Sequence, residues 1–143
     1  MVTYILDASG ALRYIDNEEG AVRVGEILQS GLRGHARVLI SAIHWGEIAG
    51  VIHRRFGIAT MQKVLVSLLA SGIELVAVTS EHAVRAIVIK NDFKIPYADA
   101  FGVVLTQDLT QSVLITGDFD FKPAEQMISI EFLPQKPTPS QKP

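Results

Sequence analysis

The chain of 143 residues contains no cysteine. This absence excludes disulfide bonds, thiolate metal sites and a cysteine nucleophile. Long hydrophobic runs are missing as well. No apolar segment approaches the roughly 18 uninterrupted residues of a membrane span, and residues 1–7 lack the basic region and long apolar run of a secretory signal. We therefore expect a cytoplasmic protein with no membrane-spanning segment.

A strong excess of positive charge is also lacking. The chain has 13 Lys and Arg residues against 15 Asp and Glu residues, which gives a net charge of −2. This balance argues against a protein that coats nucleic acid electrostatically. If four of the acids bind a metal, however, the remaining side chains carry a small positive excess, so charge neither supports nor excludes an RNA substrate. The hydrophobic content of 48% provides for a sizeable core, and the length fits one domain.

Predicted strands and helices alternate along the chain. Short runs rich in Val, Ile and Leu predict strands, and the segments between them space apolar residues as helices do. We expect strands at residues 3–6, 37–40, 73–78, 112–115 and 127–132, and helices at 18–30, 42–56, 59–70, 80 to about 91, and 97–109. This alternation predicts an α/β fold with a central, mostly parallel five-stranded sheet. The last ten residues contain four prolines, so we expect a domain over residues 1–133 and a flexible tail over 134–143.

Two acidic residues directly follow predicted strands. Asp7 comes after the first strand and Asp118 after the fourth. Because ligands bind at the carboxyl ends of the strands in an open parallel sheet, both carboxylates are candidates for a functional site. The alternative is that each acid serves only as a helix N-cap or turn residue, a role that Asp favours.

Two further acids, Glu47 and Asp99, lie on mostly apolar faces of predicted helices. A charge that faces a core is costly unless it is paired or bound to a metal. One explanation is a buried salt bridge with Arg54, Arg55 or Lys94. We favour convergence of all four acids on a cation. All-oxygen ligation suits Mg²⁺ or Mn²⁺ better than zinc.

Hydroxyl groups accompany the two acids at the strand ends. Ser9 lies two residues after Asp7, and Thr116 lies two residues before Asp118. These hydroxyls can orient the carboxylates or a metal-bound water, although ordinary capping explains them equally well. Asp120 is either an outer metal ligand or a loop acid.

Four segments that carry these acids resemble the acidic motifs of PIN domains. They are Tyr4-Ile-Leu-Asp-Ala-Ser9, Ser41-Ala-Ile-His-Trp-Gly-Glu47-Ile, Ile95-Pro-Tyr-Ala-Asp99-Ala and Leu114-Ile-Thr-Gly-Asp118-Phe-Asp-Phe121. The match is closest to VapC-type toxins of toxin–antitoxin systems and covers residues 2 to about 133. No single motif is specific, but four acids in this order and at these separations are typical of the family. One departure is Gly10, where members usually carry a bulkier apolar residue, and we expect a looser backbone there.

The resemblance implies a three-layer α/β/α fold, endoribonuclease activity dependent on Mg²⁺ or Mn²⁺, a homodimer and a small antitoxin partner. We expect the carboxylates to hold one or two divalent ions, which activate a water for in-line attack on the scissile phosphate of RNA. The residues expected to bind metal and carry catalysis are Asp7, Glu47, Asp99 and Asp118. Candidates for contacts with the RNA backbone are Arg54, Arg55 and Lys94. A role for His44 in the site stays open.

Three other functions remain as alternatives. An aspartyl-phosphate hydrolase also uses an Asp after the first strand, but that chemistry usually requires a second acid two residues later, where this chain has Ser9. The chain can also be a non-catalytic, metal-stabilised module that binds RNA or an antitoxin, or a housekeeping nuclease that processes RNA.

Overall fold

A single sheet of five parallel strands organises the protein in the computed structural model, which describes residues 1–137. The strand order is β3-β2-β1-β4-β5. The strands are β1 (Val2–Leu6), β2 (Ala36–Ser41), β3 (Glu74–Val76), β4 (Ser112–Thr116) and β5 (Ile130–Phe132). The strand order reverses at β1, which pairs with β2 on one side and β4 on the other. The carboxyl ends of these central strands define the edge at which a parallel sheet binds ligands.

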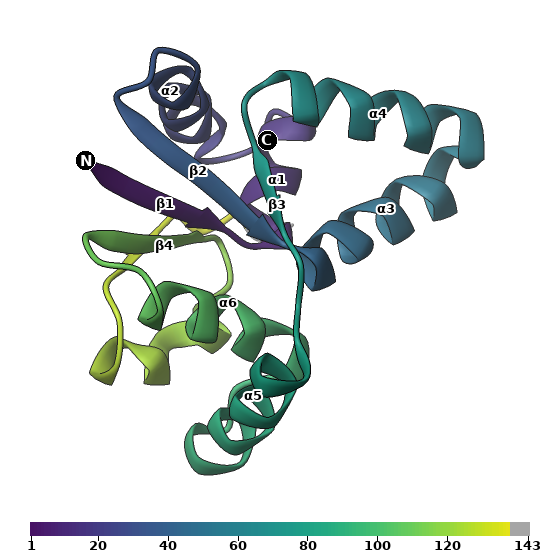
Figure 1. Ribbon diagram of the computed structural model, residues 1–143. Helices are drawn as coiled ribbons and strands as arrows, with labels where there is room; N and C mark the ends of the chain where they lie inside the picture. Colours follow the sequence, from purple (N-terminus) through teal and green to yellow (C-terminus); the bar gives the residue numbers. More distant parts are fainter. Residues whose placement is uncertain (138–143) are drawn as a thin grey trace.

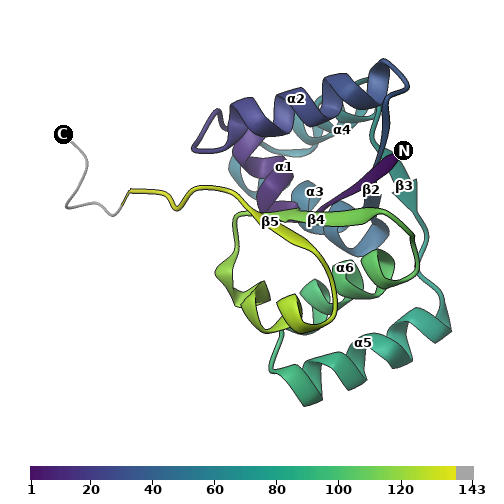
Figure 2. The same ribbon diagram turned by 90° about the vertical axis from the view of Figure 1, so that its left-hand side faces the viewer.

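Helices cover both faces of the sheet and make three layers (Figures 1 and 2). The helices α1 (Ala8–Ile15), α2 (Ala21–Leu32), α3 (Ala42–Phe56) and α4 (Ile58–Ala70) lie on one side, and α5 (Ser80–Phe93), α6 (Tyr97–Gln107) and the 3₁₀ helix η1 (Phe119–Gln126) lie on the other. Neighbouring residues of β1 enter different cores: Ile5 packs with α5 and α6, whereas Leu6 packs with α1, α2 and α3. Side chains alternate between the faces of a strand, so a strand covered on both faces is apolar throughout.

The expected α/β fold with a mostly parallel sheet and three layers is confirmed. Several predicted boundaries were wrong. The third strand was expected over residues 73–78 but covers Glu74–Val76, and the fifth was expected to begin at 127 but begins at Ile130, because η1 extends to Gln126. The first predicted helix begins at Ala21 rather than residue 18, and the last ends at Gln107 rather than 109.

Two short helices, α1 and η1, were missed in the sequence. The α1 helix is only eight residues long and contains glycine, and η1 contains Pro123. Both features weaken the local helical signal. Each helix is capped by a candidate acid: the side chain of Asp7 accepts from the backbone N–H of Gly10, and that of Asp118 accepts from the backbone N–H of Asp120. The capping role considered for both acids is therefore present.

The described part of the tail contacts the domain. The carbonyl oxygen of Pro134 accepts a hydrogen bond from Arg13 at 2.6 Å, and Lys136 forms an ion pair with Glu18 at 3.0 Å. Residues 138–143 of the expected flexible tail lie outside the described residues, so the boundary at residue 133 stays a prediction. Within residues 1–137, no helix has the length and hydrophobicity to cross a membrane.

Candidate metal centre

Asp7 lies at the carboxyl end of β1 and is 2% exposed. Its Oδ1 accepts hydrogen bonds from the backbone N–H of Gly10 and the hydroxyl of Ser9, both at 2.8 Å. Its Oδ2 accepts from Ser9 at 2.8 Å and from Thr116 at 2.6 Å. Three donors therefore fix the orientation of a buried carboxylate.

The hydroxyls of Ser9 and Thr116 also connect Asp7 to the next strand. Ser9 Oγ accepts from the backbone N–H of Gly117, and Thr116 Oγ1 accepts from the backbone N–H of Asp118, both at 2.9 Å. Each hydroxyl thus bridges the Asp7 carboxylate and the loop that follows β4. This arrangement holds the ends of β1 and β4 in one position.

Gly10 packs closely instead of giving a loose backbone. A Cβ atom at this position would lie 3.1 Å from the carbonyl oxygen of Ile115 and 3.3 Å from Oδ1 of Asp7. The expectation of a looser backbone was wrong, because the absence of a side chain lets α1 approach β4.

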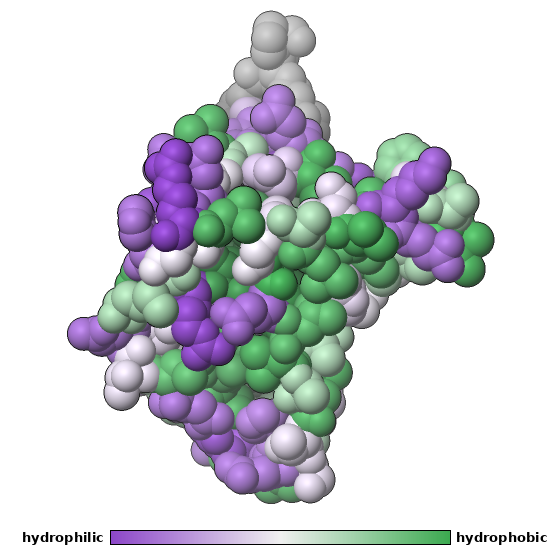
Figure 3. Space-filling model, turned by 45° about the horizontal axis from the view of Figure 1, so that its top comes forward, coloured by the Kyte–Doolittle hydropathy of each residue, from purple (hydrophilic) through white to green (hydrophobic). Residues whose placement is uncertain are grey.

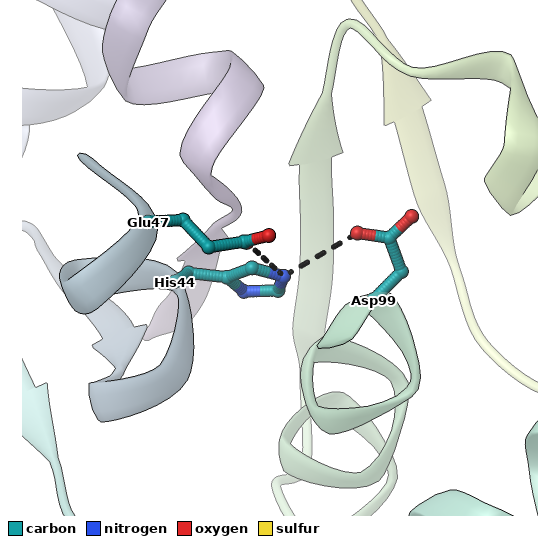
Figure 4. A group of neighbouring side chains, drawn as sticks. All are labelled: His44, Glu47 and Asp99. Atoms are coloured by element: carbon teal, nitrogen blue, oxygen red, sulfur yellow. Dashed lines mark ion pairs between the residues drawn. The ribbon is translucent and has the colours of Figure 1, made fainter. Parts of the chain in front are cut away.

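Glu47 and Asp99 reach the same edge of the sheet from different helices. Glu47 lies in the second turn of α3, which begins after the Ser41 cap at the end of β2, and Asp99 lies in the first turn of α6. Both carboxylates point toward the imidazole of His44 (Figure 4). Nε2 of His44 lies 3.6 Å from Oδ1 of Asp99 and 3.8 Å from Oε1 of Glu47. Within residues 1–137, His44, Glu47 and Asp99 have ligand atoms within 4.8 Å of one another, close enough to share a cation, and Asp7 and Asp118 are not in this group.

Burial raises the pKa of three carboxyl groups, and like charges raise it further in two of them. Burial is the main cause for Asp7, where His44 and the hydrogen-bond donors oppose it. Burial also raises the pKa of Glu47, and the carboxylates of Asp99, Asp7 and Asp118 raise it further, while His44 lowers it. At Asp118, burial and the charges of Asp99 and Asp120 outweigh the hydrogen bond from the Asp120 N–H. Neighbouring carboxylates therefore act on Glu47 and Asp118.

His44 is fully buried among these acids. Burial lowers the pKa of its imidazole, but Asp99, Asp7 and Glu47 outweigh that effect and leave the pKa above its usual value. At 3.6 Å, the contact with Asp99 is longer than a hydrogen bond. The sequence left the role of this histidine open, and the structure puts it between the two helical acids.

The proposed salt bridges to the helical acids are absent from residues 1–137. None of the four carboxylates lies within ion-pair distance of a Lys or Arg there. Arg55 instead donates to both carboxylate oxygens of Asp16 at 3.0 Å. Arg54 and Lys94 are exposed. A salt bridge with one of these three cations therefore does not explain why Glu47 and Asp99 lie on apolar helix faces, and that alternative was wrong.

A cleft of about 500 Å³ opens beside Asp118. Its lining includes Ser9, Asp118 and Phe119, the cations Arg13, Arg55 and Lys136, and the acids Asp16 and Glu18, which pair with Arg55 and Lys136 respectively. Of the three predicted RNA contacts, Arg55 is in this lining, and Lys94 lines a separate hollow with Pro96. Asp120 is exposed, and its N–H contacts Asp118.

Arg13 was missed in the sequence. It is 5% exposed, and its guanidinium donates to the carbonyl oxygens of Glu19, Pro134 and Gly117. The available signal was its spacing from Ser9, because residues four apart share one face of a helix. That signal required the prediction of α1.

The comparison with protein families identifies the chain. The PIN domain model matches residues 4–125, and the chain belongs to the PIN-domain family. This confirms the resemblance that the acidic motifs gave. No curated protein sequence matches the chain significantly.

Solved structures share the fold at low sequence identity. VapBC2 from Rickettsia felis, bound to a DNA fragment from its promoter, matches with a TM-score of 0.72 and 14% identity over 93% of this chain and 100% of that one. VapBC-1 from nontypeable Haemophilus influenzae gives 0.67 and 15% identity over 92% and 98% of the two chains. VapC20 from Mycobacterium tuberculosis, described as a toxin that cleaves the sarcin-ricin loop, gives 0.65 and 16% identity over 92% and 99%.

Proposed function

We propose that this PIN-domain protein is a divalent-metal-dependent endoribonuclease, and that its catalytic carboxylates are Asp7, Glu47, Asp99 and Asp118. One observation carries the proposal. Glu47 and Asp99 lie with His44 within reach of one cation, Asp7 and Asp118 follow the central strands β1 and β4 at the same edge of the sheet, and in residues 1–137 none of the four acids pairs with Lys or Arg. Such a group of carboxylates calls for a cation to offset its repulsion.

The carboxylate oxygens fit Mg²⁺ or Mn²⁺. A bound divalent ion supplies an activated water and offsets negative charge on the phosphate that is attacked. Hydrogen bonds from Ser9 and Thr116 hold the carboxylate of Asp7 in one orientation at the site. Glu47 and Asp118 are more exposed and can adjust to an ion or assist a proton transfer. The buried, fully engaged Asp7 is a poor nucleophile, which argues against an aspartyl-phosphate hydrolase.

The RNA backbone lies, in this proposal, along the cleft beside Asp118. Arg55 and Lys136 line this cleft, each paired with an acid of the same lining, Asp16 and Glu18 respectively. Phosphate groups are bound mainly by such cations, and in this proposal RNA phosphates take the place of the two acids. Phe119 is 39% exposed at the same cleft and offers an aromatic face for a base. Single-stranded RNA is the substrate that this combination suits.

We also propose that the protein is the toxin of a toxin–antitoxin pair and forms a homodimer. Three of the similar structures are described as VapBC, and another is described as a toxin–antitoxin complex from Klebsiella pneumoniae. In this chain, α4 buries only Leu68 and exposes Ile58, Val66 and Leu69. Hydrophobic residues gather across the middle of the face drawn in Figure 3. Exposed apolar surface of this kind marks protein-binding sites.

An RNA-cleavage assay tests the nuclease. Purified protein is incubated with single-stranded RNA in Mg²⁺, in Mn²⁺ and in EDTA, alongside Asp118→Asn and the control Asp92→Asn, which changes an exposed acid on α5. We expect metal-dependent cleavage that falls by about two orders of magnitude or more in Asp118→Asn and not in the control. Equal cleavage by wild type and Asp118→Asn, or none in any metal, would contradict the proposal.

A further inference from the structure

The imidazole of His44 presents a ring nitrogen with no partner to the candidate metal centre. His44 is 0% exposed, and Nε2 has no hydrogen-bond partner in residues 1–137. Buried polar atoms are almost always paired, so an unpaired one needs an explanation. Figure 4 shows that this nitrogen is directed at the carboxylates of Glu47 and Asp99.

Two contacts fix the ring in this orientation. Nδ1 lies 3.4 Å from the buried hydroxyl of Ser41. On the other side, a Cβ atom at Gly102 would lie 3.1 Å from Cε1 of His44, so the ring packs against the backbone of α6. When Nδ1–H donates to Ser41, the lone pair of Nε2 points at the two acids. A hydrogen bond of this kind to the far ring nitrogen is what orients histidines that bind metals.

The spacing of the three groups suits one ion. Ligand atoms about 2.0–2.2 Å from a metal lie about 3 Å from one another. Nε2 is 3.6 Å from Asp99 and 3.8 Å from Glu47, so coordination requires these gaps to close by less than about 1 Å. The side chain of Glu47 is 45% exposed and has room to move.

We propose that Nε2 of His44 is a direct ligand of the divalent ion, together with the carboxylates of Glu47 and Asp99, and that the site consequently prefers Mn²⁺ to Mg²⁺. The inference rests on the proposed metal-dependent function and departs from the all-oxygen ligation expected from the sequence. Imidazole nitrogen suits transition metals, whereas Mg²⁺ prefers oxygen and water. Metal binding replaces any proton on Nε2.

Pulsed electron paramagnetic resonance of bound Mn²⁺ tests the coordination directly. We expect the full-length protein to show the modulation of a directly bound ¹⁴N, and we expect ¹⁵N-histidine labelling of the wild type to change it. His44→Asn should lose this signal. His53→Asn, which changes an exposed histidine on the same helix, should keep it. Bound Mn²⁺ without nitrogen coupling in the wild type would overturn the proposal, and that experiment needs no variant to fold.

Calorimetric titration tests the proposed preference of the site for Mn²⁺ over Mg²⁺. We expect wild-type protein to bind Mn²⁺ at least about tenfold more tightly than Mg²⁺, and His44→Asn to lose at least about tenfold in Mn²⁺ affinity with a smaller loss for Mg²⁺. An equal loss for both ions would contradict a nitrogen ligand.

RNA cleavage is scored separately. Cleavage without nitrogen coupling rejects only the role of His44, and nitrogen-bound Mn²⁺ without cleavage rejects only the nuclease.

Discussion

The hydroxyl of Thr116 lies 2.6 Å from Oδ2 of Asp7. Thr116 belongs to β4 and is fully buried, and Asp7 follows β1, which pairs with β4 in the sheet. The same hydroxyl accepts from the backbone N–H of Asp118. The side chain of Thr116 thus connects the carboxylate of Asp7, at the end of β1, to the backbone of Asp118, which follows β4.

Replacement of this hydroxyl should destabilise the fold. Thr116→Val keeps the shape but leaves Asp7 with one donor fewer and the Asp118 N–H without its acceptor. An unpaired buried polar group costs about 1–3 kcal/mol, and we expect a loss of that size in the free energy of unfolding. Urea denaturation in EDTA measures it. Thr110→Val, an exposed threonine, is the control, and equal stability of Thr116→Val and wild type would contradict the argument.

Arg13 should contribute to the stability of the domain. Its guanidinium joins α1, the loop after β4 and the start of the tail through the carbonyl oxygens of Glu19, Gly117 and Pro134. We expect Arg13→Met to lower the free energy of unfolding by about 2 kcal/mol or more, because hydrogen bonds to a charged donor are strong. Urea denaturation compares it with Arg33→Met, which changes an exposed arginine. An unaltered unfolding midpoint would show that these bonds do not stabilise the domain.

The apolar surface of α4 should support association. Val66 is 67% exposed on this helix. We expect light scattering at micromolar concentration to give twice the chain mass of 15.6 kDa. We expect Val66→Glu to weaken the dimer and Gln62→Glu, at an exposed polar position of α4, to leave it intact. A monomer across the whole concentration range would contradict the homodimer.

The sequence predicted the parts of this protein that depend on regular patterns. Runs of Val, Ile and Leu located the five strands, and the position of Asp7 and Asp118 after strands placed both at the carboxyl edge of the sheet. The apolar faces around Glu47 and Asp99 indicated that these acids turn inward. This is confirmed for Asp99, whose side chain is 14% exposed, but was wrong for Glu47, whose side chain is 45% exposed although its carboxylate lies near His44.

The relations that depend on tertiary contacts could not be predicted. Arg55 was a candidate partner for a helical acid, but it pairs with Asp16, which is distant in sequence. The orientation of the His44 ring, whose Nε2 has no hydrogen-bond partner in residues 1–137, depends on its contact with α6 at Gly102. Periodicity along the chain contains no information on such contacts.

Acidic pH should stabilise the metal-free protein through Glu47. Burial and the neighbouring carboxylates raise its pKa above the ordinary value of 4.5. The folded state therefore binds the proton more tightly than the unfolded chain. This contribution to stability is complete below the ordinary pKa and is lost as pH rises through the folded-state pKa. We expect the stability of wild type relative to Glu47→Gln to fall as pH rises above about 4.5 in EDTA. Thermal melts across pH test this, with Glu19→Gln, between α1 and α2, as the control. A relative stability that rises with pH would contradict the sign.

A bound metal ion should offset the repulsion among the neighbouring carboxylates, and a substitution of Asp118 tests this most clearly. The charges of Asp99 and Asp120 act on it, and burial is the main cause of its raised pKa. Asn at this position keeps an oxygen that can accept from the Asp120 N–H and so preserves the cap on η1. We therefore expect Asp118→Asn to melt slightly higher than wild type in EDTA.

When metal is added, wild type should melt higher than Asp118→Asn. A ligand that binds only the folded state stabilises it by about 2.7 kcal/mol at a hundredfold excess over its dissociation constant. Wild type should gain close to this amount with Mn²⁺, and Asp118→Asn should gain less, because it has one carboxylate fewer for the ion. Thermal melts with and without Mn²⁺ measure both gains, and Asp92→Asn should follow the wild type. If Asp118→Asn gains as much as wild type, Asp118 does not hold the ion. If it melts below wild type in EDTA, the capping contact of Asp118 outweighs the repulsion among the four acids.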